Sequence, residues 1–135
     1  MSVIVSDTGF APEDFTTPFT PLAEVDSTTT ALDLGADTNP AELGDRLDGV
    51  TMIRVDFPGS ADGRGFSIAR QLRLMGYGGR LRARGHVIAD QYAMARRSGF
   101  DEVEISEALA KRQPEDQWMF RANWQAHDYQ ARLRG

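Results

Sequence analysis

A glycine-rich turn, Asp62-Gly63-Arg64-Gly65, is the first place in this sequence where the residue types could do chemistry. It follows a segment with the pattern of a strand and precedes one with the pattern of an amphipathic helix. Loops and helix N-termini at the carboxyl ends of parallel strands present free N–H groups to anions, and arginines clustered around the helix start would add bidentate donors. The candidate anion-binding residues are Gly63, Arg64, Gly65, Ser67, Arg70 and Arg73.

The same turn has a purely structural interpretation, in which its glycines adopt positive φ and allow a tight strand-to-helix connection. Two nucleotide-binding patterns fail here. The dinucleotide fingerprint requires glycine or alanine where this chain has Ile68, and the phosphate-binding loop requires a nearby lysine, whereas the only lysine is Lys111. A nucleotide loop is therefore excluded, and an anion site and a tight turn both remain open.

Candidate proton-transfer residues come from the turn and from the end of a later strand. His86, with Asp90 close by, is a pairing that general acid–base catalysis uses, and Asp62 or Asp90 could accept a proton. A solvated or locally hydrogen-bonded side chain is the alternative for each. The second histidine, His127, is far from His86 in the sequence and lacks the short spacing of metal ligands. No metal and no cofactor is predicted.

A regular series of strands and helices must position these residues. Alternation of apolar and polar residues indicates strands at 29–34, 50–57, 79–84 and 101–106. The expected helices begin at Asn39-Pro40, follow the glycine turn with Ile68, Leu72 and Met75 on one face, span about 87–98 before Gly99, and fill two stretches at the end of the chain. Four strand–helix units in a row imply a parallel sheet joined by right-handed crossovers.

One face of the expected sheet is charged. Parallel strands buried on both faces have continuous apolar runs, but here charged residues alternate with apolar ones along each strand. The residues expected on the polar face are Asp33, Arg54, Asp56, Arg82, Arg84, Glu102 and Glu104. Acids and bases on neighbouring strands can pair, whereas unpaired burial would cost several kcal/mol for each charge. We therefore expect an open, half-barrel-like α/β sheet of about four parallel units, whose polar face is covered by the C-terminal helix or by a second subunit.

The two ends of the chain differ from its middle. Residues 1–28 are expected to form an extended N-terminal arm, with a short strand at 3–5 and phenylalanines that pack onto a single α/β domain at 29–135. At the other end, Phe120 and Trp124 point away from the buried side of the last helix. Apolar surface on two sides of one helix is a mild sign of a homodimer or of another partner.

Composition excludes several classes of function. The chain of 135 residues carries a formal net charge of −5 and has a pI near 4.9, so nucleic acid is a poor partner. It contains no cysteine, which excludes disulfides, thiol redox chemistry and cysteine-held clusters. No apolar run approaches the roughly 20 residues of a membrane span, and the N-terminus has no secretory signal. A cytoplasmic protein without membrane contact is expected.

A series of short matches runs through about 50–105 of the chain. They are Phe57-Pro58, Asp62 to Ser67, Ala69-Arg70, Leu72-Arg73, Gly76-Tyr77, Leu81-Arg82-Ala83, Asp90-Gln91 and Gly99-Phe100-Asp101, with a weaker match at Tyr129-Gln130. In this order they resemble the pattern of the bacterial domain-of-unknown-function family 934. Gly85-His86-Val87 stands where the family has Gly-Asp-Val, so the resemblance gives His86 no role.

Members of that family are encoded beside genes for sulfite or nitrite reductase and carry the label of an oxidoreductase involved in sulfite reduction. The resemblance implies an accessory protein of assimilatory sulfite reduction, which binds the reductase or an oxyanion or phosphorylated intermediate through the turn and helix at 62–73. Without cysteine, the label has no visible chemical support in thiol chemistry. One alternative is a small enzyme acting on a phosphorylated or sulfated metabolite, with Arg64 and Arg70 for the anion and Asp62 or Asp90 as proton acceptor. Another is a structural module whose polar sheet face forms a homodimer interface.

Overall fold

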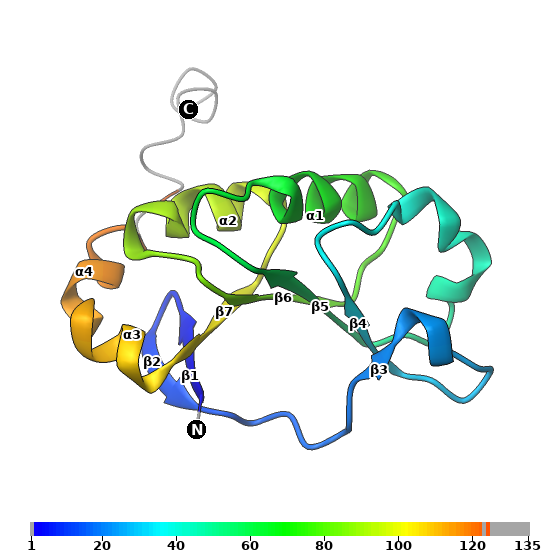
Figure 1. The fold of residues 1–135 in the computed structure, drawn as a ribbon, viewed down its shortest axis with the longest axis horizontal. Coiled ribbons are helices and arrows are strands. Elements are labelled where there is room, and N and C mark those ends of the chain that lie inside the picture. Colours follow the sequence, from blue (N-terminus) through cyan, green and yellow to red (C-terminus); the bar gives the residue numbers. More distant parts are fainter. Residues whose placement is uncertain (1, 123, 125–135) are drawn as a thin grey trace.

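The computed structural model describes residues 2–122 and 124, which form one open, seven-stranded sheet with helices (Figure 1). The strands are β1 (Ser2–Ser6), β2 (Gly9–Pro12), β3 (Thr20–Pro21), β4 (Ala31–Leu34), β5 (Met52–Phe57), β6 (Arg80–Gly85) and β7 (Glu102–Ser106). Their order in the sheet is β2-β1-β7-β6-β5-β4-β3. The expected α/β class is confirmed, and the sheet is not closed into a barrel. The end of the last expected helix, including His127 and Tyr129, lies outside the described residues.

The strands expected from alternation are β4 to β7, and the N-terminal region adds a strand or hairpin at each edge. Neighbours from β4 to β7 pair in parallel, with Asp56 opposite Arg84 and Arg84 opposite Glu104. Strand β1 pairs antiparallel with β7 and with β2, and β3 pairs parallel with β4. The strand expected at 3–5 lies in β1. Strands β2 and β3 are too short for a pattern of alternation to reveal them.

The helices are α1 (Arg64–Leu74), α2 (Tyr92–Ser98), α3 (Glu107–Arg112) and α4 (Glu115–Met119), with 3₁₀ turns η1 (Leu22–Glu24), η2 (Pro40–Glu42), η3 (Gly44–Leu47) and η4 (Ala89–Gln91). The helix expected at Asn39 forms only short 3₁₀ turns, because Gly44 follows at a φ of 41°. The helix expected over 87–98 begins with η4 and ends at Gly99, whose φ is 121°. In the part of the chain that the structure describes, no helix is long and apolar enough to cross a membrane.

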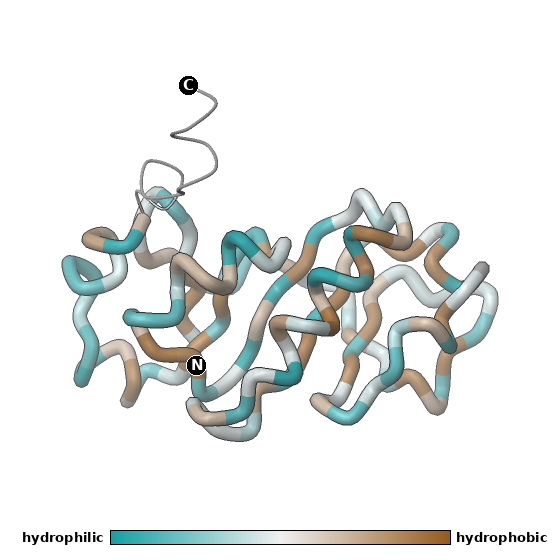
Figure 2. The backbone as a smooth tube through the Cα atoms, turned by 90° about the horizontal axis from the view of Figure 1, so that it is seen from above, coloured by the Kyte–Doolittle hydropathy of each residue, from teal (hydrophilic) through white to brown (hydrophobic). Residues whose placement is uncertain are grey.

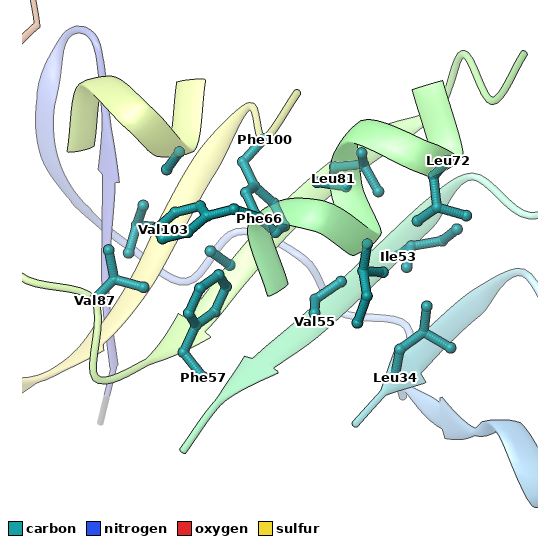
Figure 3. Packing of buried hydrophobic residues seen from close by; sticks show 14 of the residues in the cluster. Leu34, Ile53, Val55, Phe57, Phe66, Leu72, Leu81, Val87, Phe100 and Val103 are labelled. Carbon is teal, nitrogen blue, oxygen red and sulfur yellow. The ribbon is translucent and has the colours of Figure 1, made fainter. Parts of the chain in front are cut away.

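Helices α1 and α2 cover one face of the sheet and bury its apolar side chains (Figures 1 and 3). Val55 and Phe57 of β5 belong to this core, together with Ile68 and Leu72 of α1. Met75, expected on the same helix face, is 39% exposed because it follows the end of α1. Burial of each such side chain contributes roughly 1.5–3 kcal/mol relative to its exposure, so this face supplies the hydrophobic stabilisation of the fold.

The opposite face carries the charges, and polar and apolar residues interleave along the chain (Figure 2). Arg54 Nε lies 2.7 Å from Asp33 Oδ1, and Arg54 Nη1 lies 3.2 Å from Glu104 Oε1. Arg82 pairs with Glu102, and its Nη1 lies 2.9 Å from Glu104 Oε1. The Arg82 side chain is 0% exposed. An unpaired guanidinium at this depth would be strongly destabilising, so the acids of β7 are required beside it.

Residues 13–19, which we call the strap, cross this charged face. The strap leaves β2 at one edge of the sheet and reaches β3 at the other, on the side opposite α1 and α2 (Figure 1). Glu13 pairs with Arg82, and Asp14 Oδ1 lies 2.9 Å from Arg80 Nη2. The N-terminal arm is therefore held on the sheet by ion pairs.

Aromatic rings hold the other half of the strap. The Phe19 ring centre lies 3.9 Å from the Arg54 guanidinium, and the Phe15 and Phe19 rings are 5.2 Å apart. The expected packing of the arm's phenylalanines onto the domain is confirmed. Within residues 2–122 and 124, the strap lies on the polar face, for which the C-terminal helix or a second subunit was the expected cover. Trp118 of α4 instead packs edge-on against Tyr92 of α2, with ring centres 6.1 Å apart.

The strap's ion pairs predict a loss of stability in acid. Burial opposes ionisation of Glu13, but hydrogen bonds from Arg82 and from the Phe15 N–H lower its pKa overall, and the Arg80 hydrogen bond lowers the pKa of Asp14. Carboxyl groups whose pKa falls on folding stabilise the fold above their unfolded pKa, near about 4, and this contribution is lost as pH drops through the folded pKa. In urea denaturation, the free energy of unfolding should fall more steeply below about pH 4 in the wild type than in E13Q/D14N. Equal slopes would contradict this.

Candidate functional site

The predicted anion turn is neutralised by its own ion pair. In the loop between β5 and α1, Arg64 Nη2 lies 2.7 Å from Asp62 Oδ2, and the Arg64 N–H donates to Asp62 Oδ1 over 3.1 Å. The side-chain hydrogen bond from Arg64, with help from its backbone N–H, lowers the pKa of Asp62 to about 2. Asp62 is therefore ionised near neutral pH and poorly suited to accept a proton. The Arg64 guanidinium is correspondingly less available to an external anion.

The two glycines of the turn have different roles. Neither of them adopts a positive φ. Gly63 precedes α1 at a φ of −92°, and a Cβ placed on it would have no neighbour closer than Phe66 Cδ2 at 3.9 Å. A Cβ on Gly65 would overlap the ring of Phe57. Gly65 is therefore needed for the close approach of α1 to β5, so the tight-turn interpretation holds through packing and not through backbone conformation.

Arg73 does not belong to the turn. It lies in the last turn of α1, about 13 Å along the helix axis from Arg64. Its guanidinium donates to the carbonyls of Gly79 over 2.7 Å and of Gly99 over 2.8 Å. The structure thus corrects the expected arginine cluster: Arg73 joins the loops at the opposite end of the sheet.

Two other predicted anion-binding residues share a shallow hollow. Arg64 and Ser67 line a depression of about 420 Å³ that Asp37 also lines. The negative charges of Asp37 and Asp62 reduce the attraction of this surface for an anion. Arg70 is exposed but does not line the depression. The structure therefore does not gather the predicted anion-binding set into one site.

A different hollow lies where β5, β6 and β7 end, which is the usual position of ligand sites in parallel sheets. It has a volume of about 430 Å³, and its polar lining is Ser2, Asp56, Arg84, His86, Glu104, Ser106 and Arg112. A second hollow of about 290 Å³ shares His86, Leu109 and Arg112 with it and adds Ile88 and Gln113. We call the two together the carboxyl-end groove.

A glycine at the end of β6 places His86 in the groove. Gly85 has a φ of 119°, and a Cβ there would lie 2.6 Å from the Phe57 carbonyl oxygen, so only glycine fits. The His86 N–H donates to the same carbonyl over 3.0 Å, and His86 Nδ1 lies 3.3 Å from it. Because a carbonyl only accepts, Nδ1 carries a proton in this contact. That leaves Nε2 as the ring nitrogen available to a ligand.

The groove contains Arg84 and Arg112, and neither has a short ion pair within residues 2–122 and 124. Arg84 is half-exposed, with Nε 3.5 Å from Glu104 Oε2 and Nη1 4.0 Å from Asp56 Oδ1. Its neighbours on the same sheet face have ion pairs of 2.7–2.9 Å. Arg112 is exposed in the last turn of α3, a helix whose N-cap is Ser106. Within residues 2–122 and 124, the groove therefore offers two guanidinium groups with unused donors.

The sequence pointed to part of this groove. The residues it named and the structure brings together here are Asp56, Arg84, His86 and Glu104. It did not name Arg112 or Ser2 for this site, because α3 and β1 reach the groove only through tertiary packing. One signal was present: Ser106, followed by Glu107, marks a helix start directly after β7.

The expected acid–base pair of His86 and Asp90 is not assembled in the groove. Asp90 does not line it, and its Oδ1 lies 2.9 Å from Arg121 Nη2 with the Asp90 side chain 74% exposed. The carboxylates that line the groove together with His86 are Asp56 and Glu104. Across residues 2–122 and 124, no group of three or more histidine and acidic side chains is placed to hold a metal ion.

The glycines of the turn allow a matched test of its structural role. Gly65→Ala should lower the free energy of unfolding by about 1–3 kcal/mol, because the new methyl group must displace the Phe57 ring. Gly63→Ala, two residues away with open space around it, should change it by less than about 1 kcal/mol. Chemical denaturation followed by far-UV circular dichroism measures both. Equal effects would show that packing against Phe57 does not explain Gly65.

The sequence pattern of a family described as "Bacterial protein of unknown function (DUF934)" matches residues 31–135. This match includes β4 to β7, all four α-helices and every groove residue except Ser2, whereas β1 to β3 and the strap precede it. No curated protein and no solved structure matches the chain. Because the match covers most of the sequence and confirms the resemblance found in its middle, the chain belongs to the bacterial DUF934 family.

Proposed function

We propose that this chain is a non-catalytic, cytoplasmic accessory protein of assimilatory sulfite reduction, which binds an oxyanion or a phosphorylated or sulfated ligand in the carboxyl-end groove. The role in sulfite reduction, and the reductase as partner, rest on the family resemblance. The observation that carries the binding role is the meeting of Arg84, His86 and Arg112 on one groove.

The chemistry of Arg84 and Arg112 suits an oxyanion. A guanidinium presents paired N–H donors that match a phosphate or sulfate group, and hydrogen bonds between charged groups are the strong ones. Arg84 has only long contacts of 3.5 and 4.0 Å to its carboxylates, so binding an anion need not break a short ion pair. Arg112 offers further donors from α3, and the Nε2 of His86, with the ring proton on Nδ1, can accept a hydrogen bond from a hydroxyl group of the ligand.

The shape of the groove favours an oxyanion that carries an organic part. Arg84 lines only the larger hollow and Ile88 only the adjoining one, while Leu109 and Arg112 line both. A free oxyanion would leave this second hollow to water. We infer that the charged end of the ligand lies at Arg84 and Arg112, with an apolar portion against Ile88 and Leu109.

A second candidate function is an enzyme that acts on such a ligand. The observation in its favour is that Asp56 and His86 line the same groove as the arginines, so a carboxylate and an imidazole would face a bound oxyanion ester. In this case Asp56 takes the proton-accepting role that the sequence assigned to Asp62 or Asp90. We also keep the half-barrel-like arrangement of the sheet as a proposal, with the charged face inside and the groove at its mouth.

Anion binding can be tested with inorganic phosphate, sulfate, sulfite and phenyl phosphate, using isothermal calorimetry. Phenyl phosphate should bind more tightly than phosphate, because its ring reaches the apolar hollow. Arg84→Gln and Arg112→Gln should each weaken phenyl phosphate binding about tenfold or more, as expected for a lost charged hydrogen bond. Arg64→Gln and Arg70→Gln, on the glycine turn and α1, should change it less than about twofold.

The arginine variants also decide between the two anion sites. Glu104 keeps its pairs with Arg54 and Arg82 when Arg84 is replaced, so the fold should persist, which circular dichroism checks. If Arg64→Gln abolished binding while Arg112→Gln left it intact, the anion would bind at the glycine turn. That result would overturn the proposed groove.

The accessory role predicts a physical association with the reductase. An affinity-tagged chain expressed at its natural level should co-purify with sulfite reductase from cells grown on sulfate. The signal should disappear from cells in which the untagged chain is present in large excess, because both forms compete for the same partner. Normal growth on sulfate of a strain that lacks the chain, with no reductase recovered, would contradict the role.

A further inference from the structure

The strap contacts the sheet as a bound peptide would. Its sequence is Glu-Asp-Phe-Thr-Thr-Pro-Phe, and it is held by two carboxylates and two phenyl rings against arginines of β5 and β6. We call the side chains of Arg54, Arg80 and Arg82, where the strap lies, the arginine face. In Figure 1 the strap runs under the sheet as a connecting segment without regular structure.

The strap is seated by side chains alone. Within the described residues, no backbone hydrogen bond joins residues 13–19 to the sheet beneath them. The side chains of Glu13 and Asp14 remain 34% and 63% exposed, although Arg82 below them is fully buried. A segment held in this way can leave the surface without breaking a strand ladder, in contrast to β1 on β7.

The fit of the strap is also incomplete. Arg82 Nη2 is buried and has no hydrogen-bond partner among residues 2–122 and 124, and it lies 3.5 Å from Asp14 Oδ1. A buried donor without a partner costs stability. A carboxylate seated slightly deeper than Asp14 would satisfy this donor, so the strap does not use every donor of the arginine face.

The family match begins between the strap and the arginine face in the sequence. The arginine face lies wholly within residues 31–135, which the family pattern covers, whereas the strap lies before residue 31. The arginine face therefore lies in the matched part of the chain, and the strap precedes it.

We propose that the arginine face is a docking surface for an acidic, phenylalanine-containing peptide segment of a partner protein, and that the strap occupies this surface as an intramolecular ligand. The strap shows the chemistry that the partner segment needs: carboxylates for Arg80 and Arg82, and a phenyl ring for Arg54. Tethering gives the strap an effective concentration in the millimolar range, so a free peptide competes only when the strap is weakened. This goes beyond anion binding in the carboxyl-end groove and does not depend on it.

The test uses the full chain and a labelled peptide with the sequence of residues 12–20. Fluorescence anisotropy should show weak binding to the wild type and at least about tenfold tighter binding to E13Q/D14N, whose strap has lost its charges. Adding Arg80→Gln to that variant should remove most of the gain. A peptide with glutamine and asparagine in place of its two acids should not discriminate between the wild type and E13Q/D14N.

A separate measurement shows whether the strap has left the surface. Chymotrypsin should cut after Phe15 faster in E13Q/D14N than in the wild type. F15A/F19A, which weakens the strap through its rings, should be cut faster after Glu13 by a glutamate-specific protease and should also gain peptide affinity. Phenyl phosphate binding should stay unchanged in both variants.

Each outcome bears on the proposal. Faster cleavage without a gain in peptide affinity would show that the exposed arginine face does not bind such segments. Unchanged cleavage in both variants, or loss of the folded state by circular dichroism, would show that the strap is an integral part of the core. Either result overturns the proposal and leaves the groove untouched, because the anion titration is read independently.

Discussion

The arrangement of the polar sheet face depends on one buried charge, the guanidinium of Arg82. It is excluded from water and lies against Glu102 and Glu104 on β7, which neutralise it, while Glu13 of the strap contacts it from the exposed side. Ionic groups buried at this depth contribute little net stability, but removing one partner is strongly destabilising. The strands are therefore held in one register, because a slip of one residue would bring apolar side chains opposite the arginine.

The pairing of Arg82 with Glu104 also affects the carboxyl-end groove. Glu104 is shared between Arg54 and Arg82, and Ser2 Oγ donates to it over 3.2 Å. The same carboxylate is the closer of the two that Arg84 contacts, at 3.5 Å. A carboxylate already engaged by two guanidiniums has little capacity left for a third. Because Glu104 is engaged at the centre of the face, Arg84 stays incompletely paired at its rim, where the strands end and a ligand can enter.

The sequence predicted those parts of the fold that follow from local periodicity. Strands β4 to β7, helix α1 and the end of α2 at Gly99 all have short-range signals in apolar alternation or capping residues. The same alternation named the charged residues of the sheet. It could not say which of them would be left partly exposed, because that depends on how Glu104 divides its oxygens among three strands.

The features that the sequence did not predict depend on contacts between distant segments. The strap and β3 have no periodicity, so their place across and beside the sheet is set by partners that come much later in the chain. Arg73 matched the family pattern next to the glycine turn, yet its side chain joins carbonyls at the far end of α1. Arg112 joins the groove because α3 turns back at Ser106, and its charge alone did not distinguish it from other exposed bases.

The short outer strands have a consequence for how copies of this protein meet. Strand β3 is only two residues long and ends in Pro21, and β2 ends in Pro12, so both borders of the sheet include a residue without an N–H donor. A short edge strand that contains proline is a poor template for pairing with a strand of a neighbouring chain. Sheet-to-sheet polymerisation is therefore disfavoured at high protein concentration, and any symmetric pairing of two molecules must rely on side chains and not on an extended ladder.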